Sequence, residues 1–210
     1  MSALVIDRAR SDLSERPVAG LSNDQVIIEL LQTPNHLSRW LTPIHDRTVL
    51  EFSPRRAQLS VKDVLLQMRD TETWAYQRMY AIATQVNPDL DRLPNVEPSP
   101  RAGVVDRRAD ALVTMAAFRR VRQSSTSLLR ALPDTAWARG GYSRKERNWT
   151  VRQLAEFLVD RDRESLQEID RLLVQSGARA GIAQVSQVRY DAIDEPYRGS
   201  LDAELQAGGS

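Results

Sequence analysis

The sequence predicts an all-α protein built as a four-helix bundle, on the evidence of its helix start signals and its apolar spacing. Three segments open with a hydroxyl residue, followed three positions later by a side chain that can cap back onto the backbone. These are Ser22 to Gln25, Ser60 to Asp63 and Thr150 to Gln153. Apolar residues then recur every three or four positions, as on one face of a helix. Such helices bury their apolar faces only by packing against one another.

The extent of these apolar stripes along the sequence predicts four helices of roughly 20 to 28 residues. Their expected ranges are residues 22–44, 60–86, 104–132 and 150–175. In the first helix, Pro34 predicts a kink or a restart. The inward face of the third helix is expected to carry Ala109, Leu112, Val113, Ala116, Val121, Leu128 and Leu129. Residues 87–100 contain four prolines, which predict an irregular and long connection that allows a crossover.

Length and composition predict one domain with extensions. Of the 210 residues, 1–20 are expected to form a flexible N-terminal segment, 21–176 the bundle domain, and 177–210 a partly flexible C-terminal extension. The chain has no cysteine, which excludes thiolate zinc sites and thiol nucleophiles and fits a reducing compartment. No apolar run reaches the roughly 18 residues of a membrane-spanning helix. A cytoplasmic location is therefore expected, with no membrane partner.

The net charge of +1 gives no overall field that would hold nucleic acid. Arginine supplies almost all of the 29 basic residues, but it is spread along the whole chain, whereas a nucleic-acid footprint clusters. The loop at residues 139–149 interleaves basic and aromatic side chains, which is typical either of a single-strand binding surface or of a solvated loop. We favour the solvated loop, in which Trp149 anchors the start of the fourth helix. Nucleic acid is therefore not expected as a partner.

A polar functional site is expected where polar residues interrupt the apolar stripe of the fourth helix. An apolar stripe at helical spacing would contain Leu154, Leu158, Arg161, Ser165, Ile169 and Leu172. Burying an unpaired guanidinium is costly, so Arg161 on this stripe implies a carboxylate partner or a polar cavity. The alternative is a rotated helix, in which Phe157 or Leu166 faces inward and Arg161 extends to solvent. Both alternatives stay open from the sequence.

Two segments resemble motifs of the DinB/YfiT-like superfamily. The segment from Leu59 to Glu72 is similar to that family's second-helix motif in its start, its apolar spacing and its acidic residues Asp70 and Glu72. The segment 149–169 is similar to the family's fourth helix. The first helix also fits, so that the resemblance covers residues 22–176. It implies a four-helix bundle of DinB/YfiT-like type with a long crossover connection.

The resemblance also implies where a metal site would lie. In the family, three histidines form a candidate metal site, and in this chain their places fall on Gln67, Arg161 and Ser165. Arginine cannot bind a cation, so we expect no metal and no cofactor. A polar cluster is expected instead, in which Arg161 pairs with Asp70 or Glu72. The carboxylates Asp160, Asp162 and Glu164 are expected on a solvated face. The only histidines, His36 and His45, lack the spacing of a shared metal site.

Three functions follow as alternatives. The first is a metal-free DinB-like protein that binds a small ligand, such as a small anion at Arg161, or a protein partner, without being an enzyme. The second is a metal-dependent hydrolase or thiol-linked transferase, which the resemblance implies but the residues Gln67, Arg161 and Ser165 do not support. The third is a structural or dimerising bundle, since bundle faces commonly pair and a homodimer is usual in such a family.

Overall fold

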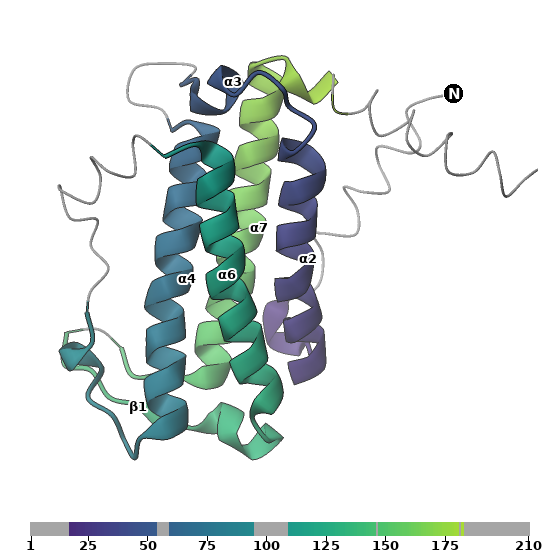
Figure 1. Ribbon diagram of the computed structural model, residues 1–210. Helices are drawn as coiled ribbons and strands as arrows, with labels where there is room; N and C mark the ends of the chain where they lie inside the picture. The colour runs from purple at the N-terminus through teal and green to yellow at the C-terminus, as the bar shows by residue number, and fades with distance from the viewer. Residues whose placement is uncertain (1–16, 54–58, 95–108, 146, 181, 183–210) are drawn as a thin grey trace, which may run out of the picture.

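The computed structural model describes residues 17–53, 59–94, 109–145, 147–180 and 182. Four long helices pack side by side (Figure 1). They are α2 (Asn23–Leu41), α4 (Val61–Thr84), α6 (Ala111–Ala131) and α7 (Val151–Gln175). The predicted all-α four-helix bundle is confirmed. Most of the two predicted flexible ends, residues 1–16 and 183–210, lies outside the described residues.

Short elements close the two ends of the bundle. The helix α3 (Thr48–Glu51) lies at one end, beside the start of α4 (Figure 1). The short elements away from this end are η1 (Val18–Gly20), η2 (Leu90–Arg92), η3 (Asp134–Ala138), β1 (Gly140–Gly141) and β2 (Trp149–Thr150). β1 and β2 pair antiparallel, Gly140 with Thr150 and Gly141 with Trp149. Gly141 is required there, because a Cβ atom would lie 2.8 Å from Leu90 Cδ2.

The three predicted capping boxes are present. Ser22, Ser60 and Thr150 each accept a hydrogen bond from the backbone three residues on, and the side chain at that position accepts from the capping residue in return. The third helix begins at Ala111, later than predicted, because Asp110 caps it by accepting from Leu112 N at 2.6 Å. The predicted start near Val104 lies outside the described residues.

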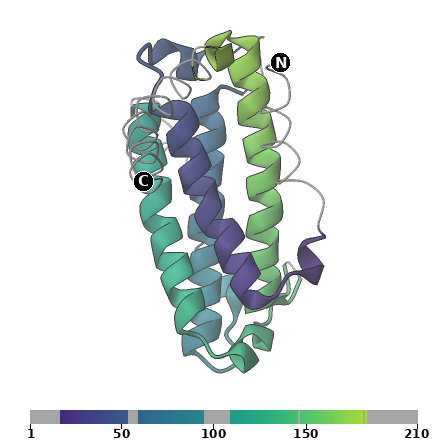
Figure 2. The same ribbon diagram turned by 90° about the vertical axis from the view of Figure 1, so that its right-hand side faces the viewer.

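The helices follow an order with a crossover, as predicted. Arg139, just after α6, donates to the carbonyls of Ala83 and Gln85 at the end of α4, so α4 and α6 run parallel. Arg152, at the start of α7, donates to Asn23 at the start of α2, so these two helices also run parallel (Figure 2). The chain between α4 and α6 therefore joins opposite ends of the bundle. Each of α2 and α4 packs against both α6 and α7.

The core consists of two apolar clusters, one in each half of the bundle. Leu30, Met79 and Leu158 belong to one cluster, and Leu37, Leu65 and Leu166 to the other. On each long helix the two clusters are separated by buried polar residues. These are Thr33 on α2, Glu72 on α4, Arg122, Ser125 and Thr126 on α6, and Asp162 on α7. We call Thr33, Glu72, Arg122 and Asp162 the polar layer.

The prediction of which face α6 buries was largely wrong. Val113 is 58% exposed, and of the residues expected inside only Leu129 is fully buried. The buried face carries Ala111, Thr114, Met115, Phe118, Arg122, Ser125, Thr126 and Leu129. This face of α6 is the buried one because it carries Arg122, which binds Glu72 and Asp162 in the polar layer. No helix in the described ranges is long and apolar enough to span a membrane.

Candidate functional site

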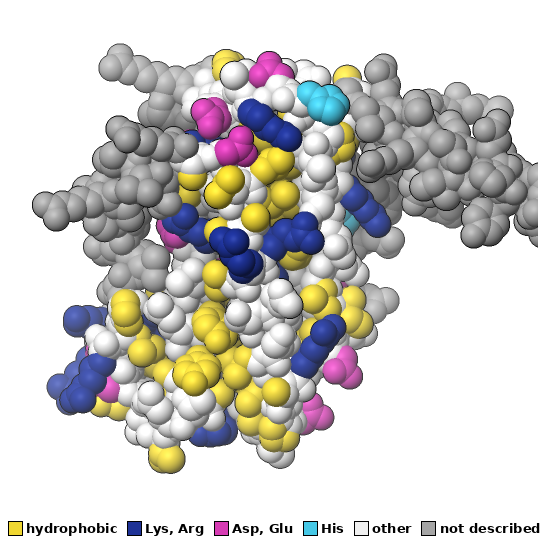
Figure 3. Space-filling model, viewed as in Figure 1, with side chains coloured by type: hydrophobic (Ala, Val, Ile, Leu, Met, Phe, Trp, Pro, Cys, Tyr) yellow, Lys and Arg dark blue, Asp and Glu magenta, His cyan; other side chains and the backbone are white. Residues whose placement is uncertain are grey.

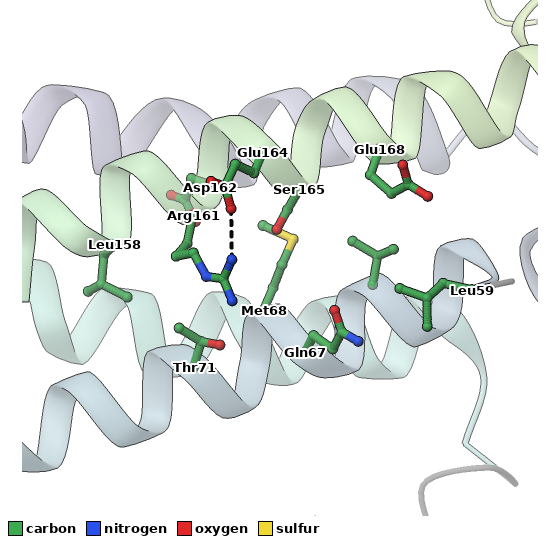
Figure 4. A pocket seen from close by; sticks show the side chains of 11 residues that line it. Leu59, Gln67, Met68, Thr71, Leu158, Arg161, Asp162, Glu164, Ser165 and Glu168 are labelled. Carbon is green, nitrogen blue, oxygen red and sulfur yellow. Dashed lines mark hydrogen bonds and ion pairs between the residues drawn. The ribbon is translucent and has the colours of Figure 1, made fainter. Parts of the chain in front are cut away.

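A pocket opens between α4 and α7 (Figure 4), with a cavity volume of about 150 Å³. Its apolar wall consists of Leu59, Val64, Met68 and Leu158. Its polar wall consists of Gln67, Thr71, Arg161, Asp162, Glu164, Ser165 and Glu168. The structure thus brings the three predicted site residues, Gln67, Arg161 and Ser165, to one cavity. Gln67 and Met68 come from the first half of α4, because the capping box at Ser60 fixes where that helix starts.

Arg161 lies at the exposed rim of this pocket, not on the buried stripe. Its side chain is 56% exposed, and Nη1 donates to Glu164 Oε2 at 2.8 Å. Its guanidinium carbon also lies 5.8 Å from the centre of the Phe157 ring. The rotated alternative for the fourth helix is therefore correct in placing Leu166 inside. Asp162, one residue further along, takes the buried position between Leu158 and Leu166.

The predicted pairing of Arg161 with Asp70 or Glu72 is wrong. Asp70 accepts from its neighbour Arg69 at 2.7 Å, and Glu72 accepts from Arg122. The reason is geometric: Glu72 points into the bundle axis and is fully buried, whereas Arg161 sits on the outer edge of α7. Asp162 also departs from expectation, since it lies in the core and not on a solvated face.

Arg122 is the centre of the polar layer. Its Nη1 donates to Asp162 Oδ2 at 2.6 Å, and its Nη2 donates to Asp162 Oδ1 at 2.9 Å and to Glu72 Oε2 at 2.7 Å. Thr33 Oγ1 donates to Asp162 Oδ2 at 2.8 Å. One residue from each of the four long helices therefore belongs to one hydrogen-bonded cluster. Its strongest hydrogen bonds are those of the bidentate pair between the Arg122 guanidinium and the Asp162 carboxylate.

Pro34 accounts for one further contact of Arg122. Proline has no N–H, so in α2 it cannot donate to the carbonyl of Leu30, four residues earlier. Arg122 Nη1 donates to that Leu30 carbonyl at 2.9 Å. The kink or restart expected at Pro34 is not a restart, because α2 continues through it. The guanidinium of Arg122 thus satisfies a buried acceptor that the proline leaves free.

The electrostatics of the polar layer follow from its composition. Two carboxyl groups share one guanidinium, and all three side chains are buried. Burial raises the pKa of Glu72 above its ordinary value; the charge of Arg122 opposes this change and the charge of Asp162 adds to it. For Arg122, burial lowers the pKa, but the two carboxylates outweigh it and raise the pKa overall. Burial thus disfavours the ionised form of Glu72, whereas the two carboxyl groups favour the charged form of Arg122.

Sequence reasoning missed Arg122 and Asp162, although a signal for each was present. Arg122 continues the spacing of Met115 and Phe118 toward Leu129, and Asp162 stands four residues from both Leu158 and Leu166. Each is a charged residue on an apolar stripe, 40 positions apart, on helices that the sequence predicts to be neighbours in a bundle. A search for two opposite charges on two buried stripes would have found the pair.

Asp162 connects the polar layer to the pocket, because the same residue also lines the pocket. On the other side of α7 it borders a much smaller cavity of about 10 Å³, beside Thr33 and His36. Burial lowers the pKa of His36, and the charge of Arg39 adds to this effect. The His36 and Trp40 rings lie with their centres 6.0 Å apart and their planes tilted by 53°. The smaller cavity has no room for a ligand beyond a single water.

The residues around the pocket do not fit a divalent metal ion. The positions that hold histidines in the DinB/YfiT-like motif carry an amide, a guanidinium and a hydroxyl, and the guanidinium repels a cation. The nearest buried carboxylate, Asp162, is already paired with Arg122. In the part of the chain that the structure describes, no group of three His, Cys, Asp or Glu residues could hold a metal.

The basic loop before α7, residues 139–149, is held by hydrogen bonds and ring contacts. Asp91 accepts from Ser143 Oγ at 2.6 Å and from Arg144 N at 2.8 Å. Arg147 lies 3.6 Å over the Trp149 ring, which packs edge-on against Trp74. Figure 3 shows basic side chains spread over the height of the face of α4 and α6 instead of gathered at one end. Arg144, Lys145 and Arg147 are exposed, and Trp149 is buried at the entrance to α7.

Comparison with known proteins gives a structural match. No protein-family model matches the chain, and no curated protein matches it either. Among solved structures, YfiT from Bacillus subtilis matches with a TM-score of 0.62 and 20% sequence identity, covering 78% of this chain and 94% of YfiT. YfiT is described as a probable metal-dependent hydrolase with an unusual four-helix bundle topology. The predicted resemblance is thus confirmed at the level of fold: the chain is a YfiT-like four-helix bundle.

Proposed function

We propose that the protein binds a small ligand through an anionic group, in the pocket between α4 and α7, and does not act as a metal-dependent hydrolase. The guanidinium of Arg161 supplies the positive charge, and the Gln67 amide and the Ser165 hydroxyl supply hydrogen bonds. The observation that carries this proposal is the presence of all three side chains at one cavity, where the family resemblance implies metal ligands.

Arg161 is available to a ligand because its present partner is weak. Both Arg161 and Glu164 are more than half exposed, and an exposed ion pair contributes at most about 1 kcal/mol. A carboxylate or phosphate group that enters the pocket can displace Glu164 and accept from both guanidinium nitrogens. The side chain of Glu164 then turns to solvent at little cost.

The size of the cavity limits the ligand. Its volume of about 150 Å³ equals that of a cavity known to hold benzene, which has six heavy atoms. Larger ligands would extend past the rim near Arg161. The apolar wall around Met68 and Leu158 favours a ligand with a short hydrocarbon part.

A metal-dependent hydrolase is the second candidate, and only the fold favours it. Metal content separates the two. We expect the purified protein, expressed with added zinc and nickel, to contain far less than one equivalent of either metal by mass spectrometry. Stoichiometric zinc or nickel would contradict the proposal. A cytoplasmic location and a homodimer stay predictions, and gel filtration with light scattering tests the dimer.

Ligand binding is tested by NMR titration of the ¹⁵N-labelled protein at constant ionic strength, because salt screens exposed charges. The probes are inorganic phosphate, propionate, alanine and β-alanine. We expect saturable shifts of the amides around Arg161 with at least one probe, and loss of saturation in Arg161→Gln. Arg120→Gln, an exposed arginine on α6, is the matched control and should bind as the unchanged protein does. The proposal fails if no probe saturates, or if Arg161→Gln binds equally well.

A further inference from the structure

We infer that the pocket recognises a small zwitterion, whose carboxylate binds Arg161 and whose ammonium group binds the carboxylate of Asp162, given the anion site proposed above. Arg161 and Asp162 are consecutive on α7, so their side chains leave the helix about 100° apart. Because both residues line the same pocket, they can contact different parts of one ligand. Figure 4 shows both beside the same cavity.

The charges around the pocket argue against a simple anion. Its wall holds one cation, Arg161, and three carboxylates, Asp162, Glu164 and Glu168. Asp162 pairs with Arg122, and Glu168 pairs with Arg171. These two ion pairs partly offset the negative charges of Asp162 and Glu168. Even with Glu164 turned to solvent, a ligand with negative charge alone would add a further negative charge beside these carboxylates. A positive group on the ligand matches this excess of carboxylates.

Asp162 has the geometry of a recognition group. Its Oδ2 accepts from Arg122 and from Thr33, whereas its Oδ1 accepts only from Arg122. A carboxylate offers about four lone-pair positions, so Oδ1 keeps capacity for a further donor. The residue is only 5% exposed, and a hydrogen bond formed there competes little with water.

Arg122 and Thr33 are positioning residues in this arrangement. The bidentate contact with Arg122 fixes the plane of the Asp162 carboxylate, and Thr33 holds its second oxygen. Neither residue lines the pocket itself. A rigid acceptor requires the ligand's ammonium group at a set distance from its carboxylate, which would distinguish alanine from β-alanine.

The test compares ligands that differ by one charged group. Propionate, propylamine, alanine and β-alanine share a three-carbon skeleton, and their affinities are measured by the same NMR titration. We expect at least one of the two amino acids to bind about tenfold more tightly than propionate, and propylamine to bind more weakly than that amino acid. This comparison uses the unchanged protein and does not depend on any variant folding.

Variants then assign the ammonium contact. Asp162→Asn should lower the affinity of the preferred amino acid to that of propionate, while Asp160→Asn, an exposed position on the same helix, should leave it unchanged. If propionate binds as tightly as both amino acids, and Arg161→Gln abolishes binding, the zwitterion is excluded and the anion site stands. If no acid binds, or if Arg161→Gln has no effect, the proposed function itself fails.

Discussion

Arg122 donates from both terminal nitrogens to the carboxylate of Asp162, at 2.6 and 2.9 Å, in the middle of the bundle. Glu72, Thr33 and the carbonyl of Leu30 complete the cluster, which separates the two apolar halves of the core. A buried ion cluster adds little net stability compared with apolar packing, but breaking it by removing one partner is costly. Because removal of any one partner is costly, the cluster disfavours helix rotations that would separate its members.

Replacing Arg122 by methionine should strongly destabilise the protein. Two buried carboxylates and the Leu30 carbonyl would lose their shared donor, and removing one partner of a buried ion pair costs about 3–5 kcal/mol. Urea unfolding followed by circular dichroism measures the loss in the free energy of unfolding. Arg120→Met, on the exposed side of the same helix, should change it by less than about 0.5 kcal/mol. Equal stability of the two variants would contradict the role given to Arg122.

Pro34 should be energetically coupled to Arg122. Pro34→Ala restores an N–H that can donate to the Leu30 carbonyl, which already has Arg122 as a donor in the unchanged protein. The stabilising effect of Pro34→Ala should therefore be larger in the Arg122→Met background, by about 1 kcal/mol, the typical worth of one hydrogen bond. A double-mutant cycle in urea gives this coupling free energy directly. A coupling of zero would mean that the proline and the arginine act independently.

Much of the fold could be predicted from the sequence because its signals are local. The capping boxes at Ser22, Ser60 and Thr150 each depend on four consecutive residues, and all three mark a helix start in the structure. The buried faces of α6 and α7 could not be predicted in the same way. Their stripes contain Arg122 and Asp162, and each charge is tolerated only because the other one is present.

The candidate site was also predicted only in part: its residues could be grouped from the sequence, but their contacts could not. The resemblance grouped Gln67, Arg161 and Ser165, and all three line one pocket, because residues four apart on one helix face a common partner helix. The partners of Arg161 could not be predicted, since a rotation of α7 by one residue exchanges Arg161 with Asp162. The hydrophobic pattern alone fits either rotation, and in the one observed Asp162 contacts Arg122 on α6.

Arg161 and Asp162 offer a direct test of that rotation. Arg161→Gln removes an exposed ion pair and should change the free energy of unfolding by less than about 1 kcal/mol. Asp162→Asn removes a buried charge from Arg122 and should cost several times more, about 2–4 kcal/mol. Chemical denaturation of both variants in one buffer measures the difference. Similar losses for the two neighbouring positions would argue against the buried placement of Asp162.

Glu72 should make the stability depend on pH in a defined direction. Burial raises the pKa of Glu72 above its ordinary 4.5, so the folded protein keeps this proton to higher pH than the unfolded chain does. Above pH 4.5 the folded state therefore binds more protons, and the free energy of unfolding falls as the pH rises through the folded pKa.

Glu72→Gln is neutral at every pH and should lack this fall. The quantity to measure is the free energy of unfolding of the unchanged protein minus that of Glu72→Gln, between about pH 4 and pH 8. It should be constant below the ordinary pKa of a glutamate and become less favourable to the unchanged protein above it. His36 titrates in part of this range, but its contribution is present in both proteins and cancels in the difference. A difference that rises with pH would show that Arg122 outweighs burial and that Glu72 is ionised in the folded state.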